Sequence, residues 1–355
     1  MTAKTRYFVI VSLLVVGAGL GTGLVAYYVG FPASAFLGAP GGPDELRYLP
    51  STAAVVAYAD VHAVMASELR KRFRESVLPG AQENGQREFQ ELTGINIETD
   101  IDHVVAGLDP GGSGTNSPSS GVVLARGRFV AAKIEALMSD HGAHVELYQD
   151  KRLIVADHLV PDPKDVIPQL SPQIPVAPPV PQVPQSFSLT FVDPDLVAFG
   201  TTDLVRHVID LHNSGGESAR TNTGLMEHVR SLDRSNAGAV GRFDVLRARA
   251  KLPDAVADRL PPITWFSVSG EIDGGLKAVL SAEARDDDSA KNLREVVQGF
   301  LALAKLQTST KPEFQRFVNS LEIRGTGNTV ALSLDVPAQL FDALSAAMPK
   351  QPKPQ

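Results

Sequence analysis

The stretch Tyr7–Val29, YFVIVSLLVVGAGLGTGLVAYYV, decides the organisation predicted for this chain of 355 residues. It contains no charged residue, and an apolar helix of about 20 residues is long enough to cross a bilayer. Lys4 and Arg6 precede it, and the next Lys or Arg is Arg47. Because positive charge stays on the cytoplasmic side, the N-terminus is predicted to lie in the cytoplasm and the remainder of the chain outside it.

A cleaved signal peptide is the alternative interpretation of the same stretch. Ala33-Ser34-Ala35 resembles the small-residue site at which such peptides are cut. A cleavable signal has an apolar core of only about 7–15 residues, which favours a retained anchor that contacts the lipid bilayer through residues 7–29. Cleavage after Ala35 stays open.

Glycines recur inside this span at every second position. Gly17, Gly19, Gly21 and Gly23 form two overlapping G-x-x-x-G pairs. Small residues at this spacing let two membrane helices approach closely, which predicts a homodimer through the span. The other interpretation is that glycine is simply frequent in membrane helices.

Composition bounds the rest of the chain. With 43% apolar and 21% charged residues, a globular core is expected. A net charge of −7 argues against nucleic acid as a partner. The chain has no cysteine, which excludes disulfides and cysteine nucleophiles. Together with the span, this predicts a single-pass protein of the bacterial inner membrane with a periplasmic domain.

The order of expected elements predicts the fold class. Strands come in adjacent pairs separated by single helices, which is typical of an α+β fold with helices mainly on one face of an antiparallel sheet or sheets. Gly127-Arg128-Phe129 and Gly241-Arg242-Phe243 suggest that two duplicated halves make up the fold. The predicted segments are a cytoplasmic N-terminus (1–6), a transmembrane helix (7–29), a tether (30–48), a first α+β half (49–221), a second α+β half (222–347) and a disordered tail (348–355).

Two local patterns in the second half are especially clear. Trp265–Ile272 and Leu276–Ala284 predict a hairpin, with Asp273-Gly274 supplying the positive φ angles of a tight turn. The acidic run Asp286–Asp288 predicts the start of a helix that continues to Leu306. The residues expected on the buried face of that helix are Leu293, Val296, Val297, Phe300, Leu303 and Ala304.

A proline-rich insertion at 161–185 interrupts the first half. Its prolines recur at every third residue, and a polyproline II helix has three residues per turn, so they would share one edge. We expect this edge to dock a partner protein of the envelope, while a stiff spacer is the alternative. The residues concerned are Pro172, Pro175, Pro178, Pro181 and Pro184.

Several stretches together resemble a known group. They are Leu49-Pro50, Val55–Asp60, Arg126–Phe129, Asp193–Gly200 and Val205–Asp210. The chain resembles uncharacterised single-span bacterial envelope proteins that carry a domain of unknown function. The resemblance implies an envelope location and a non-standard α+β fold, and it carries over no catalytic residue.

The sequence offers no catalytic, cofactor or metal site that outweighs a structural explanation. His141 and His144 have a spacing that two metal ligands could use, but Gly142 between them favours a helix-ending turn. Glu98, Asp100 and Asp102 alternate, and helix capping explains them more simply than calcium does. The G-x-S-x-G signature of many hydrolases is missing from the sequence.

The function predicted from these observations is that of a membrane-anchored extracytoplasmic binding or scaffolding protein rather than an enzyme. A carrier of a hydrophobic ligand is the first alternative, and a hydrolase with a non-sequential active site is the second. An enclosed apolar cavity of roughly several hundred Å³ would favour the carrier, whereas a cleft of polar residues with shifted pKa values would favour the enzyme.

Overall fold

The computed structural model describes residues 42–71, 87, 89–110, 120–156, 186–232, 235–245, 261–307 and 312–337. The predicted span 7–29, the proline-rich insertion and the tail therefore lie outside the described residues. From residue 45 onward the chain divides into two compact units. Unit 1 contains residues 45–53 and 83–219, and unit 2 contains residues 54–82 and 220–355. Each unit is described by itself.

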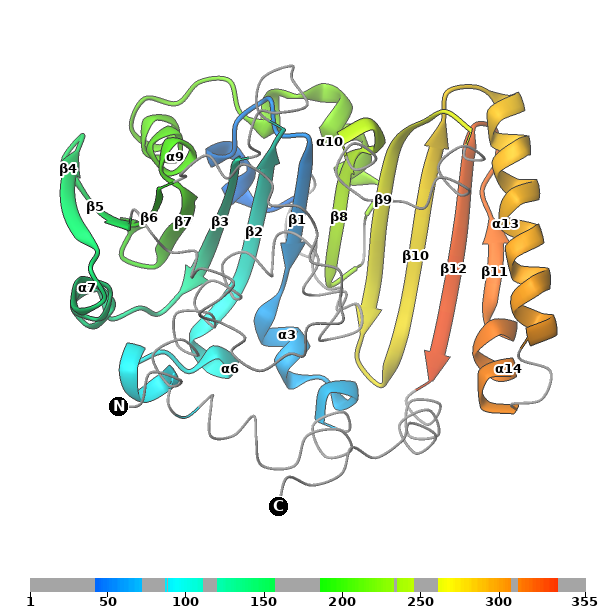
Figure 1. Ribbon diagram of the computed structural model, residues 1–355, viewed down its shortest axis with the longest axis horizontal. Helices are drawn as coiled ribbons and strands as arrows, with labels where there is room; N and C mark the ends of the chain where they lie inside the picture. Colours follow the sequence, from blue (N-terminus) through cyan, green and yellow to red (C-terminus); the bar gives the residue numbers. More distant parts are fainter. Residues whose placement is uncertain are drawn as a thin grey trace, which may run out of the picture. The chain divides into compact units, whose positions relative to one another are not determined.

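The strands correct the predicted fold class. The structure has twelve described strands, all antiparallel to their neighbours and six in each unit (Figure 1). In both units helices cover both faces of the strands, so the prediction of helices mainly on one face is wrong. Within the described ranges, no helix is both long and apolar enough to cross a membrane.

Unit 1 has the strand order β2-β3-β7-β6-β5-β4. Its strands are β2 (Ile101–Asp109), β3 (Ser120–Gly127), β4 (His144–Tyr148), β5 (Lys151–Ala156), β6 (Phe187–Asp193) and β7 (Leu196–Thr201). Its helices are η1 (Asp44–Tyr48, which starts one residue before the unit), α6 (Ile97–Asp100), α7 (Ala131–Asp140) and α9 (Thr202–Ser214). The short helix η2 (Ala219–Thr221) connects the two units along the chain.

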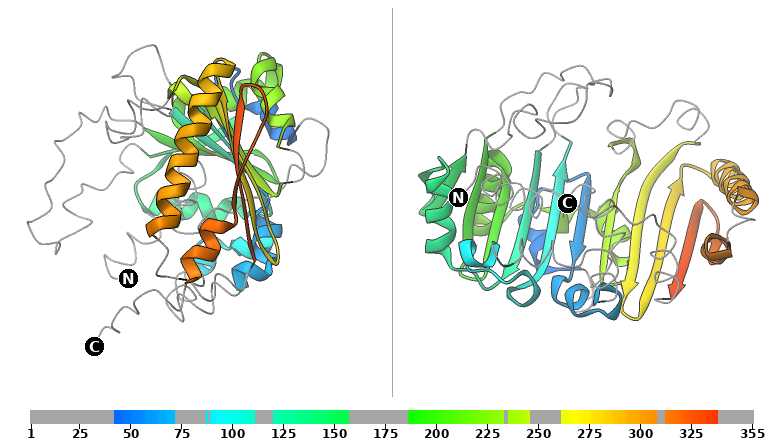
Figure 2. Two further views of the ribbon diagram at one scale, coloured as in Figure 1. Left: turned by 90° about the vertical axis from the view of Figure 1, so that its right-hand side faces the viewer. Right: turned by 60° about the horizontal axis from the view of Figure 1, so that its bottom comes forward.

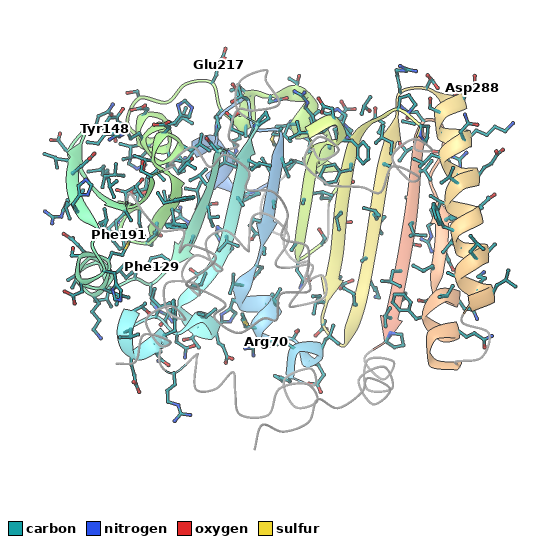
Figure 3. The ribbon with its side chains drawn as sticks, in the orientation of Figure 1. Arg70, Phe129, Tyr148, Phe191, Glu217 and Asp288 are labelled. Atoms are coloured by element: carbon teal, nitrogen blue, oxygen red, sulfur yellow. The ribbon has the colours of Figure 1, made fainter. Side chains whose placement is uncertain are left out.

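The helices α7 and α9 pack on opposite faces of unit 1. On β4, Glu146 accepts a hydrogen bond from Arg206 of α9, and the Tyr148 hydroxyl, labelled in Figure 3, donates one to Asp210 of the same helix. Arg152 of β5 pairs in register with Leu147, so it lies on the other face, where it forms an ion pair with Glu135 of α7. Alternation along a strand therefore separates the two helices.

The face of unit 1 that carries α9 is closed. We call it the sealed face. Side chains of its strands and of α9 are almost completely buried, and they comprise Val105, Leu124, Leu153, Leu196, Ala198, Val205, Val208 and Ile209. Burial of this set supplies the main hydrophobic stabilisation of unit 1.

Unit 2 has the strand order β1-β8-β9-β10-β12-β11. Its strands are β1 (Val55–Ala59), β8 (Ala237–Arg242), β9 (Ile263–Ile272), β10 (Gly275–Ala284), β11 (Leu321–Arg324) and β12 (Thr329–Pro337). Its helices are α3 (Val61–Ala66), α10 (Thr223–Arg230), α13 (Asp287–Gln307) and α14 (Pro312–Asn319). The left view of Figure 2 shows α13 and α14 on one side of β10 and β12.

The predicted hairpin of the second half is confirmed as β9 and β10, but its turn differs from the prediction. Leu276 pairs with Ile272 as expected, whereas Gly274 does not adopt a positive φ. The tight turn with two positive φ angles joins β4 to β5, where Gln149 and Asp150 have φ of 44° and 63°. A two-residue hairpin loop requires these angles, and here residues other than glycine supply them.

The predicted start of α13 is confirmed, while its buried face is only partly so. The Asp286 carboxylate accepts a hydrogen bond from the Ser289 amide at 2.8 Å and caps the helix. Leu293 is buried, but Phe300 and Leu303 are 53% and 55% exposed. The first half of the helix is therefore packed, and the second half presents apolar side chains to solvent.

The two Gly-Arg-Phe motifs occupy different positions in their units. Gly127 ends β3, and the chain then passes through α7 to β4 at the far edge of the order. Gly241 lies inside β8, and the next described strand, β9, is the immediate neighbour of β8. The order of elements predicted for two duplicated halves is not repeated.

Candidate functional site

The sequence-predicted interaction residues cannot be placed. Gly17, Gly19, Gly21 and Gly23 of the span lie outside the described residues. The same holds for the prolines of the predicted docking edge, which are Pro172, Pro175, Pro178, Pro181 and Pro184. Both sets remain predictions.

The residues weighed as metal ligands have local structural roles. His141 ends α7, and its Nδ1 lies 2.6 Å from the Leu137 carbonyl oxygen. The Asp100 carboxylate accepts a hydrogen bond from the Asn96 amide at 2.8 Å and another from Arg128. These two bonds, the backbone one first, lower the pKa of Asp100. Within the described part of the chain, no group of three His, Cys, Asp or Glu residues could hold a metal ion.

Unit 1 contains a polar network that sequence reasoning missed. The Glu45 side chain is only 3% exposed, and its Oε1 accepts a hydrogen bond from Arg126 Nε at 2.5 Å. His103 Nε2 lies 3.1 Å from the other carboxylate oxygen. Arg126 also donates to Asp195 at 2.5 Å. The network thus joins η1, β2, β3 and the turn before β7, which are far apart in sequence.

The electrostatics of this network favour a structural role. Burial by itself would raise the pKa of Glu45, but hydrogen bonds from His103 and Arg126 outweigh it and lower the pKa to about 2. A carboxylate that stays ionised, with both oxygens engaged, is poorly suited to act as a general acid or base near neutral pH. The network instead fixes η1 on the strands.

Unit 2 carries a sheet face without a polar side chain, which we call the apolar face. Its central row contains one residue from each of the six strands in direct register. These residues are Ala57, Ala239, Val268, Leu280, Leu332 and Ile323. The two neighbouring rows are also apolar throughout, with Val55, Gly241, Phe266, Ala282 and Val330 on one side and Ala59, Ala237, Gly270, Ala278, Leu334 and Leu321 on the other.

Both ends of the apolar face are covered. At one end, Ala284 and Val330 form a buried cluster with Ala290 and Leu293 of α13. At the other end, Leu276 and Val336 form a second cluster with Ile272 and Leu69, against which Phe317 of α14 packs. Helix α13 and the segment around Leu69 with α14 therefore bound the face along the strand direction.

The central row remains open between the two clusters over five of its six strands. None of its members is buried, and Leu280 is 49% exposed, but Ile323 of β11 packs against the α13 cluster. Both neighbouring rows contain buried members, such as Gly241 and Val330 in one and Ala237 in the other. We call the other five central residues, from Ala57 on β1 to Leu332 on β12, the open row. It is an apolar strip that crosses the strands between two closed walls.

The opposite face of the same strands has the composition expected for water. On β10, Lys277, Ser281 and Glu283 alternate with the apolar residues. On β9, Trp265 of this face packs against His228 of α10, with ring centroids 4.6 Å apart. Helix α10 therefore lies on the face opposite to α13. The contrast shows that the apolar face is not a general property of these strands.

Comparisons with known proteins assign neither a family nor a function to this chain. No protein-family model matches the chain, and no curated protein matches it. Among solved structures the chain is similar to one titled "Structure of crystal form I of TP0453", at 11% identity and a TM-score of 0.42. That match covers 87% of this chain and 99% of the other. A TM-score this low carries no argument about function.

Proposed function

We propose that this protein is a membrane-anchored binding protein of the bacterial envelope and that the apolar face of unit 2 is its binding surface. The observation that carries the proposal is the open row, in which half of the Leu280 side chain meets solvent in the middle of a face with no polar group. Exposed apolar surface of this kind is costly in water and typically marks an interaction site.

Of the two kinds of binding protein predicted from the sequence, the open row supports the binder of a hydrophobic ligand. A scaffold for other proteins would be expected to use a wider interface with a polar rim. The strip here is narrow and closed on both sides by packed clusters. The polar network of unit 1 supports a structural role for Glu45 and gives no support to a hydrolase.

Photo-crosslinking in native membranes tests this proposal. The photoreactive residue p-benzoylphenylalanine replaces Leu280 in the full-length chain, and the adducts are identified by mass spectrometry after irradiation. Val279 provides a matched control, because it is adjacent in sequence, 37% exposed and on the opposite face. Adducts are expected at Leu280 and not at Val279. Equal yields at the two positions would refute binding at the apolar face.

The proposed location has its own test. A reporter that is active only outside the cytoplasm, fused after Gln355, is expected to be active, because Lys4 and Arg6 hold the N-terminus inside. Activity from a cytoplasm-dependent reporter alone would refute the envelope location while leaving the binding surface in place.

A further inference from the structure

The dimensions of the open row limit what can occupy it. Neighbouring strands lie about 4.8 Å apart, so the five strands from β1 to β12 give the open row a length of about 19 Å. With the two flanking rows the apolar strip is about 14 Å wide and covers about 270 Å². A stable protein dimer buries about 800 Å² on each partner. The strip is therefore too small to hold a second copy of the chain by itself, and its size suits a small ligand.

We propose that the open row binds one extended hydrocarbon chain, such as the acyl chain of a lipid or fatty acid, lying across the strands. This inference rests on the proposed function and names the chemical class of its ligand. The row, at about 19 Å, is longer than the roughly 15 Å that one lipid chain spans in half of a bilayer core. A whole acyl chain can therefore lie along it.

The absence of polar side chains from the strip excludes most other ligands. The backbone groups of β1, β8, β9, β10, β12 and β11 are already paired in the ladders. A peptide strand lying on the face would leave its own amide groups without partners, which is unfavourable. A hydrocarbon chain has no such groups.

The width of the open part favours a chain over a helix or a ring system. Only the central row lacks buried members, and the rows beside it contain buried residues such as Gly241 and Ala237. The central row by itself is only about 7 Å wide, because rows on one face of a strand recur every two residues. An α-helix with its side chains is about 10–12 Å wide and would extend over the partly closed rows on both sides. A single unbranched chain contacts the central row and the inner edges of its neighbours without such an overlap.

The row is not uniform along its length. Over β1 and β8 it consists of the small residues Ala57 and Ala239, whereas Val268, Leu280 and Leu332 follow on β9, β10 and β12. Small side chains leave more space above the sheet. The end over β1 and β8 is therefore the deeper part, where the terminal methyl group of the chain is placed.

The test uses the natural lack of cysteine. A single Leu280→Cys substitution in the full-length chain, held in amphipol, is labelled with the polarity-sensitive dye acrylodan. Saturated fatty acids from octanoate to octadecanoate are then titrated. Affinity is expected to rise up to about fourfold per added methylene and to level off once the chain fills the row. Val279→Cys, on the opposite face, is the matched control and should show no saturable signal.

A variant that shortens the row makes the test specific. Ala239→Phe fills the deep end, so the affinity should level off at a shorter chain length than in the unmodified row. Ala57→Leu serves the same purpose if the larger substitution does not fold.

Two results would overturn the inference. One is an affinity that does not depend on chain length, and the other is a plateau that neither variant moves. If crosslinking at Leu280 still yields a specific adduct in that case, the proposed function survives and only the acyl-chain assignment fails. An adduct with a second copy or with another protein would likewise leave binding at the apolar face in place and refute the acyl-chain assignment.

Discussion

The sealed face of unit 1 and the apolar face of unit 2 are built from similar strands but end in opposite states. In unit 1, Leu124 in the middle of β3 is completely buried beside α9. In unit 2, Leu280 in the middle of β10 is 49% exposed, although clusters at both ends of its face are closed. The difference lies in the helices that cover each face. Helix α9 spans the sealed face of unit 1, whereas α13 and α14 cover only the two ends of the apolar face of unit 2.

The polar residues make this contrast sharper. The sealed face includes Ser188 and Thr190, both fully buried, and Thr190 donates a hydrogen bond to the Arg152 carbonyl oxygen at 2.9 Å. The apolar face of unit 2 has no polar side chain, although it is the face that is partly open. A face adapted to water would show the reverse distribution. This supports an apolar occupant for the open row.

Truncating one leucine on each face is the most direct way to break this comparison. Leu124→Ala is expected to lower the free energy of unfolding by about 3 kcal/mol, because it leaves a cavity in a closed core. Leu280→Ala should cost less than about 1 kcal/mol, because half of the side chain is already exposed. Urea titrations read by hydrogen-exchange mass spectrometry on β3 and β10 peptides would measure both. An equal cost would show that the open row is covered.

Acid should affect the polar network of unit 1 and spare the apolar face. The pKa of Glu45 falls from an ordinary value of 4.5 to about 2 in the folded chain. Because the folded pKa is the lower one, the stabilisation is complete above about pH 4.5 and is lost as the pH falls towards 2, up to about 3 kcal/mol. Glu45→Gln should remove this part of the pH dependence.

The measurement is thermal unfolding of the unmodified chain and of Glu45→Gln from pH 6 to pH 2. All other acidic groups are the same in the two proteins, so the difference between them reports on Glu45. The two should differ most near pH 6 and converge at low pH. Parallel curves would mean that Glu45 is not held as an ionised group. The apolar face has no titratable side chain, so Glu45→Gln should leave acyl-chain binding unchanged.

Enlarging a small residue is expected to have opposite effects on the two faces. Ala198→Leu, at a fully buried site in β7, should destabilise unit 1 by about 1–3 kcal/mol through overpacking. Ala239→Leu, in the open row, should be neutral or slightly stabilising, because Ala239 is only partly buried. Melting temperatures of the two variants give the comparison. Destabilisation by Ala239→Leu as large as that by Ala198→Leu would argue against the open row.

The smallest effect is expected at the most exposed leucine of each unit. Leu306 of α13 and Leu147 of β4 are 72% and 73% exposed. Replacing either with Lys should change the free energy of unfolding by no more than about 0.5 kcal/mol. Urea unfolding measures both variants. A large loss for one of them would identify a contact that the exposed fraction does not reveal and would restrict the comparison to the strands.

The sequence determined the features that depend on neighbouring residues. The alternation of apolar and polar residues in Leu276–Ala284 predicted a half-buried strand, and β10 is that strand. The acidic run Asp286–Asp288 predicted the start of α13, and Asp286 caps that helix. Both follow from periods of two or a few residues, which are visible locally. No local pattern of this kind tells which face of a sheet a helix will cover. Phe300 was therefore wrongly expected to be buried.

Only the tertiary structure decided which distant segments meet. Glu45, His103 and Arg126 carry no shared motif and come together because η1 packs on β2 and β3. The open row likewise joins residues as far apart as Ala57 and Leu332 through four ladders. A shift of β9 by one residue in its ladder with β10 would move Ser267 or Ser269 into it. The register across strands is fixed by packing and pairing over the whole sheet, and no stretch of the sequence contains that information by itself.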